Sequence, residues 1–143
     1  MGYEIIKPPE GNIYHYTKKI NLPGILKQGK ICRFRDSECW FSRSLADILR
    51  IMEITVMREG QRYISTNLKV ERYPKFIPED YVVLKLEPEN QNGIWVIWTD
   101  EVAPDCSVKV KQEIHDLNYL KIGFRGDLKF YPAPEVIEMT SLI

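Results

Sequence analysis

The sequence is poor in the residue types that cross-link small proteins or bind metals. Its 143 residues include three cysteines and two histidines. The number of cysteines is odd, and no two of them have the Cys-x-x-Cys spacing typical of a zinc site. Two histidines are also too few for a histidine-rich metal centre. We therefore expect reduced, structural thiols and no bound metal.

Long apolar runs are absent as well. A helix that crosses a bilayer needs about 18–20 consecutive apolar residues, and no segment of the chain approaches that length. Residues 1–9 lack the apolar stretch and the small-residue cleavage site of a signal peptide. We therefore expect a cytoplasmic protein with no membrane among its partners.

The chain has no excess of either charge, because 20 basic residues balance 20 acidic ones. This balance argues against a general nucleic-acid binder, whose affinity depends on many phosphate contacts. The charges are nevertheless uneven along the chain, since residues 1–43 carry eight basic and four acidic side chains. An N-terminal segment with excess positive charge suits a small phosphorylated ligand. The alternative interpretation is a basic surface that only contacts solvent.

The length predicts a single domain over residues 1–143. No internal repeat or low-complexity stretch divides the chain. The polar segment Ser65–Asp80 contains two prolines but is too short to be a linker between domains. We expect it to be a long surface loop that covers a ligand and contributes to the choice of substrate.

The order of expected elements indicates an α+β domain. A helix is expected over residues 22–28, with Asn21 as its N-cap and Gly29 at its C-terminal end. Ser44 and Asp47 form a capping-box pattern at the start of a second helix that ends by Gly60. Strands are expected at residues 12–16, 30–34, 38–42, 81–86, 93–98, 107–111, 128–131 and 136–139. Both helices fall in the first half and most strands in the second, which disfavours alternating parallel βαβ units.

Three short motifs carry the chemistry that the sequence offers. Ile13-Tyr14-His15-Tyr16-Thr17 is a strand with one histidine among hydroxyl groups, and the Leu-Pro-x-Ile-Leu-x-x-Gly helix follows it. Cys39-Trp40-Phe41-Ser42 is a second strand with an aromatic pair and a hydroxyl. Together these motifs resemble the N-terminal part of the ADP-ribosyltransferase-like superfamily. The resemblance covers residues 12 to about 58, roughly a third of the chain.

Within that superfamily the sequence is most similar to the DarT-like DNA ADP-ribosyltransferases and to small bacterial and phage proteins of unassigned function. The resemblance implies a split, strongly bent antiparallel sheet that holds NAD, the ADP-ribose donor, in a cleft. It implies that His15 contacts the ribose on the adenine side. The other cofactor-binding residues that it implies are Tyr16 and Thr17 beside His15, Arg33 or Arg35 at the pyrophosphate, and Trp40, Phe41 and Ser42 near the nicotinamide.

The resemblance also implies a catalytic carboxylate near the start of a later strand, where it stabilises the ribosyl cation that forms as nicotinamide leaves. That position falls near Glu113, which would act with His15, and Glu101 is the second choice. Neither glutamate lies in the Gln/Glu-x-Glu pattern of members that modify arginine or asparagine. We expect His15, Trp40 and Glu113 to share one cleft.

The function that follows is transfer of ADP-ribose from NAD to a macromolecule, either nucleic acid or protein. The small size is compatible with a toxin or a protein of phage–host conflict. Two alternatives stay open. One is a non-enzymatic binding or inhibitory module, in which His15 serves only packing and Glu113 is an ordinary solvent-facing residue. The other is an RNA 2′-phosphotransferase-like enzyme that gathers Arg33, Arg35 and Arg43 around a phosphate.

Overall fold

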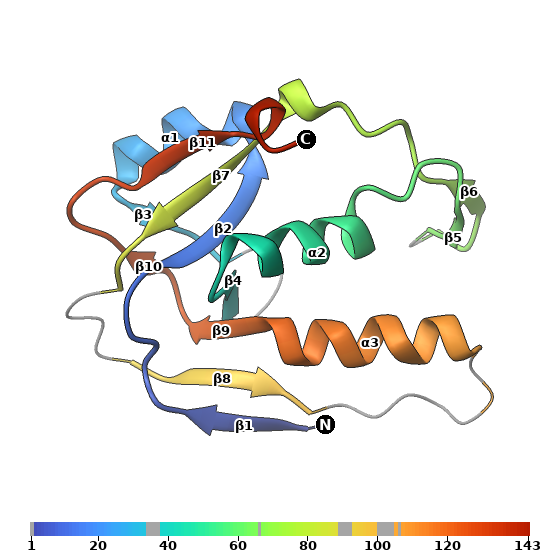
Figure 1. The fold of residues 1–143 in the computed structure, drawn as a ribbon, viewed down its shortest axis with the longest axis horizontal. Coiled ribbons are helices and arrows are strands. Elements are labelled where there is room, and N and C mark those ends of the chain that lie inside the picture. The colour runs from blue at the N-terminus through green and yellow to red at the C-terminus, as the bar shows by residue number, and fades with distance from the viewer. Residues whose placement is uncertain (1, 34–37, 66, 89–92, 100–104, 106) are drawn as a thin grey trace.

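A computed structural model describes residues 2–33, 38–65, 67–88, 93–99, 105 and 107–143 (Figure 1). In these residues three α-helices accompany a seven-stranded sheet in which every pair of neighbouring strands is antiparallel. This arrangement confirms the α+β class. The α-helices are α1 (Leu22–Gln28), α2 (Leu45–Thr55) and α3 (Val108–Leu120), and the 3-10 turns are η1 (Lys19–Asn21), η2 (Pro78–Asp80) and η3 (Met139–Ser141).

The large sheet has the strand order β1-β8-β9-β4-β2-β7-β11. Its strands are β1 (Tyr3–Ile6), β2 (Ile13–Lys18), β4 (Glu38–Ser42), β7 (Tyr81–Leu86), β8 (Trp95–Trp98), β9 (Lys121–Arg125) and β11 (Glu135–Glu138). Two small two-stranded sheets stand beside it. They pair β10 (Leu128–Lys129) with β3 (Lys30–Ile31), and β5 (Arg62–Ile64) with β6 (Val70–Arg72).

Each face of the large sheet carries its own apolar cluster, because successive side chains of a strand point to opposite faces. The first cluster includes Ile13, Phe41 and Leu84 and packs against Leu22 and Ile25 of α1. The second includes Val83 and the buried side of α2, and Leu117 of α3 packs against it. In Figure 1, α2 and α3 lie side by side in front of the sheet, whereas α1 lies at its upper end.

The caps of the first two helices show how local signals set their ends. Gly29 adopts a φ of 68° at the end of α1, the left-handed conformation that glycine tolerates best. Ser44 Oγ accepts a hydrogen bond from the Asp47 backbone N–H at 3.1 Å, as the capping pattern predicts. Asn21 does not cap α1, because its side-chain amide donates to Thr17 Oγ1 at 3.3 Å instead. The second helix ends at Thr55, before the expected Gly60.

The strand expected at residues 107–111 is wrong, because this segment begins α3. Val108 and Val110 alternate with lysines as they would in a strand. However, Ser107 Oγ accepts a hydrogen bond from the Val110 backbone N–H at 3.2 Å and caps a helix. Leu117 and Leu120 then pack on the second cluster, so tertiary contacts outweigh a short alternating pattern. Helices are therefore not confined to the first half of the chain.

The loop expected at Ser65–Asp80 is wrong in part. Its residues Val70–Arg72 form β6, which pairs with β5 in a hairpin, and Pro78–Asp80 form η2. The hairpin turn lacks an Asn-Gly or Asp-Gly signal, which explains why the pattern escaped prediction. Strands β1 and β9 were also not expected. Both are short, and β9 follows α3 without an intervening turn residue.

Candidate functional site

The two edges of β2 are paired very differently. On one side, all six residues of β2 are in register with β7. On the other side, only Tyr14 is in register with β4, opposite Ser42. Because the strands are antiparallel, the rest of β2 and the preceding residues of β4 diverge from this point. The divergence leaves a gap in the sheet where further ladder hydrogen bonds would otherwise form.

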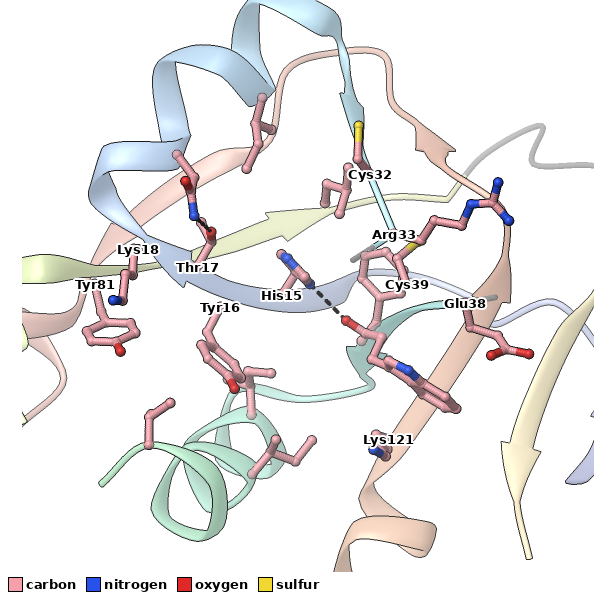
Figure 2. Close-up of a pocket in the computed structure, with 18 of the residues that line it drawn as sticks. His15, Tyr16, Thr17, Lys18, Cys32, Arg33, Glu38, Cys39, Tyr81 and Lys121 are labelled. Carbon is pink, nitrogen blue, oxygen red and sulfur yellow. Dashed lines mark hydrogen bonds between the residues drawn. The ribbon is translucent and has the colours of Figure 1, made fainter. Parts of the chain in front are cut away.

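A cavity of about 780 Å³ occupies this gap (Figure 2). Its lining includes Ile31 and Phe41 of the first apolar cluster, and Ile48 and Ile51 of the second. Because the two clusters cover opposite faces of the sheet, the cavity extends to both faces through the gap. Its volume lies within the range of pockets that bind small molecules and cofactors, roughly 300–1,000 Å³.

His15 bridges the gap by a hydrogen bond to the opposite strand. Its Nδ1 lies 2.8 Å from the Trp40 carbonyl oxygen, and the ring sits 5.4 Å from that of Phe41, between centroids. Burial lowers the pKa of His15, although the hydrogen bond to Trp40 opposes this effect. The ring is therefore neutral near pH 7. Because a carbonyl only accepts, Nδ1 carries the proton and Nε2 keeps a lone pair that can accept a hydrogen bond.

The wall on the α1 side carries polar side chains beside apolar ones such as Phe41. Thr17 and Asn21 line it, and so does Gln28, whose side-chain oxygen accepts from the Cys32 thiol at 3.3 Å. Arg33 lies at the edge of this wall, with its Nε 3.8 Å from Asp127 and half of its side chain exposed. The backbone N–H of Arg33 donates to the same carboxylate at 2.9 Å, and this bond lowers the pKa of Asp127.

The wall on the opposite face carries aromatic side chains beside Ile48 and Ile51. The Tyr16 hydroxyl lies 3.0 Å from Thr55 Oγ1 on α2, and burial raises the pKa of Tyr16 while that hydrogen bond opposes the change. Lys121 Nζ lies 4.5 Å from the ring centroids of both Trp40 and Trp98. A cation between two indole rings is held by their electron-rich faces. Figure 2 shows Tyr16 and Lys121 on the side of the sheet away from α1.

Glu38 is the carboxylate in the described lining of the cavity. Its side chain is 6% exposed and accepts from Arg125 Nε at 3.3 Å. Three basic side chains, Lys18, Arg33 and Lys121, line the same cavity. The described lining is therefore more basic than acidic, which favours an anionic ligand.

The structure brings most of the expected cofactor-binding residues to this one cavity. His15, Thr17, Arg33 and Phe41 line it from the α1 side, and Tyr16 and Trp40 line it from the opposite face. Ser42 does not line it, because its buried hydroxyl donates to the Ser44 carbonyl at 2.8 Å. Arg43 is also outside the lining. Arg35 and Glu101 lie outside the described residues.

Glu113 does not share the cleft, contrary to expectation. It lies in the middle of α3 rather than at the start of a strand, and it is not part of the described lining of the cavity. Its carboxylate is 3.0 Å from Arg58 Nη2, and its side chain is 12% exposed. The expectation for Glu113 depended on counting residues 107–111 as a strand. Because that segment instead begins α3, Glu113 lies on a helix outside the cavity.

Several lining residues were not expected. Lys18, Asn21 and Tyr81 extend the β2 side of the cavity, while Glu38 and Lys121 extend the β4 side. Lys18 and Asn21 directly follow the histidine motif, so their closeness in sequence could have indicated them. Glu38 stands just before the Trp-Phe-Ser motif. Lys121 and Tyr81 are far away in the sequence, and they are brought here by the pairing of β9 with β4 and of β7 with β2.

Comparison of the chain with models of protein families found no match, and neither curated proteins nor solved structures matched it. Within the described part of the chain, no helix combines the length and apolarity needed to cross a membrane. The same residues contain no group of three or more histidine, cysteine or acidic side chains placed to hold a metal ion. The functional argument therefore depends on the cavity and its residues.

Proposed function

We propose that the cavity between β2 and β4 binds NAD and that the protein transfers ADP-ribose to a macromolecular acceptor, nucleic acid or protein. The observation that carries the proposal is the neutral His15 fixed across the gap by its bond to the Trp40 carbonyl. Its Nε2 then accepts a hydrogen bond from a hydroxyl group of the ribose on the adenine side. In this proposal the gap takes the part of the split in an ADP-ribosyltransferase-like sheet.

The composition of the cavity supports a dinucleotide. A dinucleotide carries a charged pyrophosphate between two ring systems, and the lining offers basic side chains together with aromatic walls. Arg33 supplies a planar guanidinium at the α1 side, which can donate two hydrogen bonds to a phosphate. Trp40 and Phe41 supply apolar surfaces near the nicotinamide.

The reaction requires few catalytic groups from the protein. The bond between the nicotinamide nitrogen and C1′ of its ribose breaks, and nicotinamide leaves with the bonding electrons. An oxygen or nitrogen atom of the acceptor then bonds to C1′, and its proton passes to solvent. A nearby carboxylate stabilises the positive charge that develops on the ribose. Glu38, which lines the cavity from β4, takes this role in the proposal in place of Glu113.

The first experiment measures NAD binding by calorimetry for the wild type, His15→Ala and a matched His115→Ala control. His115 is exposed on α3, outside the described lining, so its replacement should leave affinity unchanged. His15→Ala should weaken binding at least tenfold, equivalent to about 1.4 kcal/mol. Thr17→Val, which is nearly isosteric, provides a milder change on the same wall and should weaken binding less. An absence of wild-type binding at millimolar NAD would overturn the proposal.

A second experiment separates binding from transfer. Release of nicotinamide is measured for the wild type, Glu38→Gln and Glu113→Gln, with DNA, RNA or protein offered as acceptor. Glu38→Gln should abolish release while leaving NAD affinity within a few-fold. Glu113→Gln should leave release unchanged. Loss of release in Glu113→Gln alone would reverse the assignment of the carboxylate.

A non-enzymatic binding module is the second candidate. It is favoured by the ion pairs of both carboxylates, Glu38 with Arg125 and Glu113 with Arg58. An ion-paired carboxylate has less charge to offer a ribosyl cation. In this candidate His15 serves only packing, so His15→Ala should lower stability by about 1–3 kcal/mol, and no nicotinamide is released with any acceptor.

A further inference from the structure

The β5–β6 hairpin exposes apolar side chains away from the body of the protein. Ile64 and Val70 are directly opposite each other across the two strands and are 69% and 70% exposed. Leu68, in the turn, is 84% exposed. Figure 1 shows the hairpin projecting beyond the C-terminal end of α2, clear of the large sheet. Three neighbouring aliphatic side chains in water on one projection indicate an interaction surface.

The opposite face of the hairpin anchors it. Tyr63 packs against Tyr73 with the two rings tilted and their centroids 4.6 Å apart, and the Tyr63 hydroxyl donates to Glu71 at 3.0 Å. The Arg58 guanidinium lies 5.7 Å from the Tyr73 centroid and pairs with Glu113 on α3. These contacts turn the aromatic face inward and leave the aliphatic face outward.

Leu68 stands in a backbone conformation that seldom accepts leucine. Its φ of 63° lies in the left-handed region, where glycine and asparagine are favoured. The turn is closed by hydrogen bonds between Ser65 and Leu68 and between Ser65 and Lys69, each 2.9 Å long. A leucine here strains the backbone and exposes an apolar side chain to water. Formation of the turn therefore does not explain why the sequence has leucine at this position.

Two arginines lie directly opposite each other on the same outward face. Arg62 and Arg72 are in register two residues below the Ile64–Val70 pair, and like charges at such positions repel. Arg72 Nη1 donates to the Gly60 carbonyl at 2.8 Å, which does not neutralise its charge. Neither guanidinium forms an ion pair with a carboxylate among the residues that the structure describes. The two guanidinium groups are therefore suited to binding an anionic group of another molecule.

We propose that this hairpin docks on a lipid bilayer with anionic headgroups. From its tip downward it presents Leu68, then Ile64 and Val70, then Arg62 and Arg72. Successive same-face pairs are about 6.6 Å apart along the strands. The order matches a bilayer surface, where hydrocarbon lies beneath a layer of phosphates. The aliphatic side chains enter the apolar boundary while the arginines bind headgroups.

The charges of the surrounding segment agree with this partner. Residues 58–75 hold five basic and two acidic side chains in a chain whose net charge is zero. One of the acids, Glu71, faces away from the arginines. A single-stranded nucleic acid would be matched by exposed aromatic rings rather than by aliphatic side chains. The proposal departs from the expectation of no membrane among the partners, which was based on the lack of long apolar runs. A hairpin that lies on a membrane surface needs no spanning segment.

The test is co-sedimentation of the full chain with vesicles of phosphatidylcholine, alone or with about one third phosphatidylserine. Wild type should bind the mixed vesicles and not the neutral ones. Leu68→Asn should weaken binding about tenfold, and it should fold, because asparagine suits the left-handed turn. The double change Ile64→Thr and Val70→Thr keeps strand propensity and should do the same. Arg62→Gln with Arg72→Gln should weaken binding about thirtyfold.

Matched controls lie elsewhere on the surface. Ile20→Asn removes an aliphatic side chain that is 83% exposed, and Lys27→Gln with Lys109→Gln removes two exposed charges. Both should bind like the wild type. Binding that survives all aliphatic changes would overturn the proposal, since it would be purely electrostatic. Failure of the wild type to bind vesicles would also overturn it, as would preference for a single-stranded oligonucleotide that competes with them. These results are independent of NAD binding.

Discussion

The two edges of β2 show how one strand can serve both stability and binding. Its edge with β7 is a complete ladder of six residue pairs, and Leu84, opposite His15, is fully buried there. Its edge with β4 has a single pair, and the His15 side chain makes the next connection across the gap. The complete ladder holds the strand in place, so the incomplete edge can leave space for a ligand. The difference implies that a change at the β7 edge should cost more stability than a change at the β4 edge.

Leu84→Ala should have the largest effect on stability. Truncation of a fully buried leucine leaves a cavity and lowers the free energy of unfolding by about 2–5 kcal/mol. Denaturant unfolding followed by circular dichroism measures this change. Ile5→Ala, at a side chain 70% exposed on β1, is the control and should change stability by less than about 0.5 kcal/mol. Similar losses of unfolding free energy for the two variants would mean that the β7 edge does not hold β2 in place as the ladder suggests.

His15→Phe should have the next largest effect. It keeps an aromatic ring against Phe41 but leaves the Trp40 carbonyl without its donor, which should cost about 1–3 kcal/mol. His15→Asn retains an N–H donor near the position of Nδ1 and should lose less. The same unfolding measurement compares the two variants. Equal losses would show that packing, rather than the bond across the gap, is what His15 contributes.

The smallest effect should appear as a dependence of stability on pH. Burial holds the pKa of His15 below its ordinary value of 6.5 in the folded chain. On acidification below that value the unfolded chain takes up a proton that the folded chain does not. Stability should therefore fall as pH decreases, by at most about 1.4 kcal/mol per pH unit, and stay unaffected by this group above it.

Subtracting the pH profile of His15→Phe isolates this contribution from that of the carboxylates. The difference between the two profiles should be flat above about pH 7 and slope below it. A difference that is flat throughout, or one that slopes the other way, would mean that the ring is not held neutral at the gap.

Short sequence patterns predicted part of the structure. The α+β class, helix α1 with its terminal Gly29, the Ser44 cap and the strands around His15, Trp40 and Val83 follow from patterns within about ten residues. These features depend on neighbours in sequence, which the sequence displays directly. The gathering of His15, Trp40 and Phe41 at one cavity is different, because it was expected from the resemblance to the ADP-ribosyltransferase-like superfamily and requires the pairing of β2 with β4.

Features that depend on distant contacts were not predictable in the same way. Val108 and Val110 have the alternation of a strand, but the Ser107 cap and the packing of Leu117 and Leu120 on the second cluster favour a helix. That error placed Glu113 in the site, although its carboxylate faces Arg58. Lys121 reaches the cavity through the pairing of β9 with β4, to which no local pattern points.

The two described cysteines beside the cavity differ in how readily a chemical reagent can reach and modify them. Cys39 is buried, and burial raises the pKa of its thiol to about 12, so the reactive thiolate is scarce at neutral pH. Cys32 is exposed at the rim of the same cavity. In a Cys106→Ser background, an alkylating reagent should therefore modify Cys32 in the native protein and Cys39 only after unfolding. Protection of Cys32 by a bound molecule would then give a footprint of occupancy that requires no enzymatic turnover.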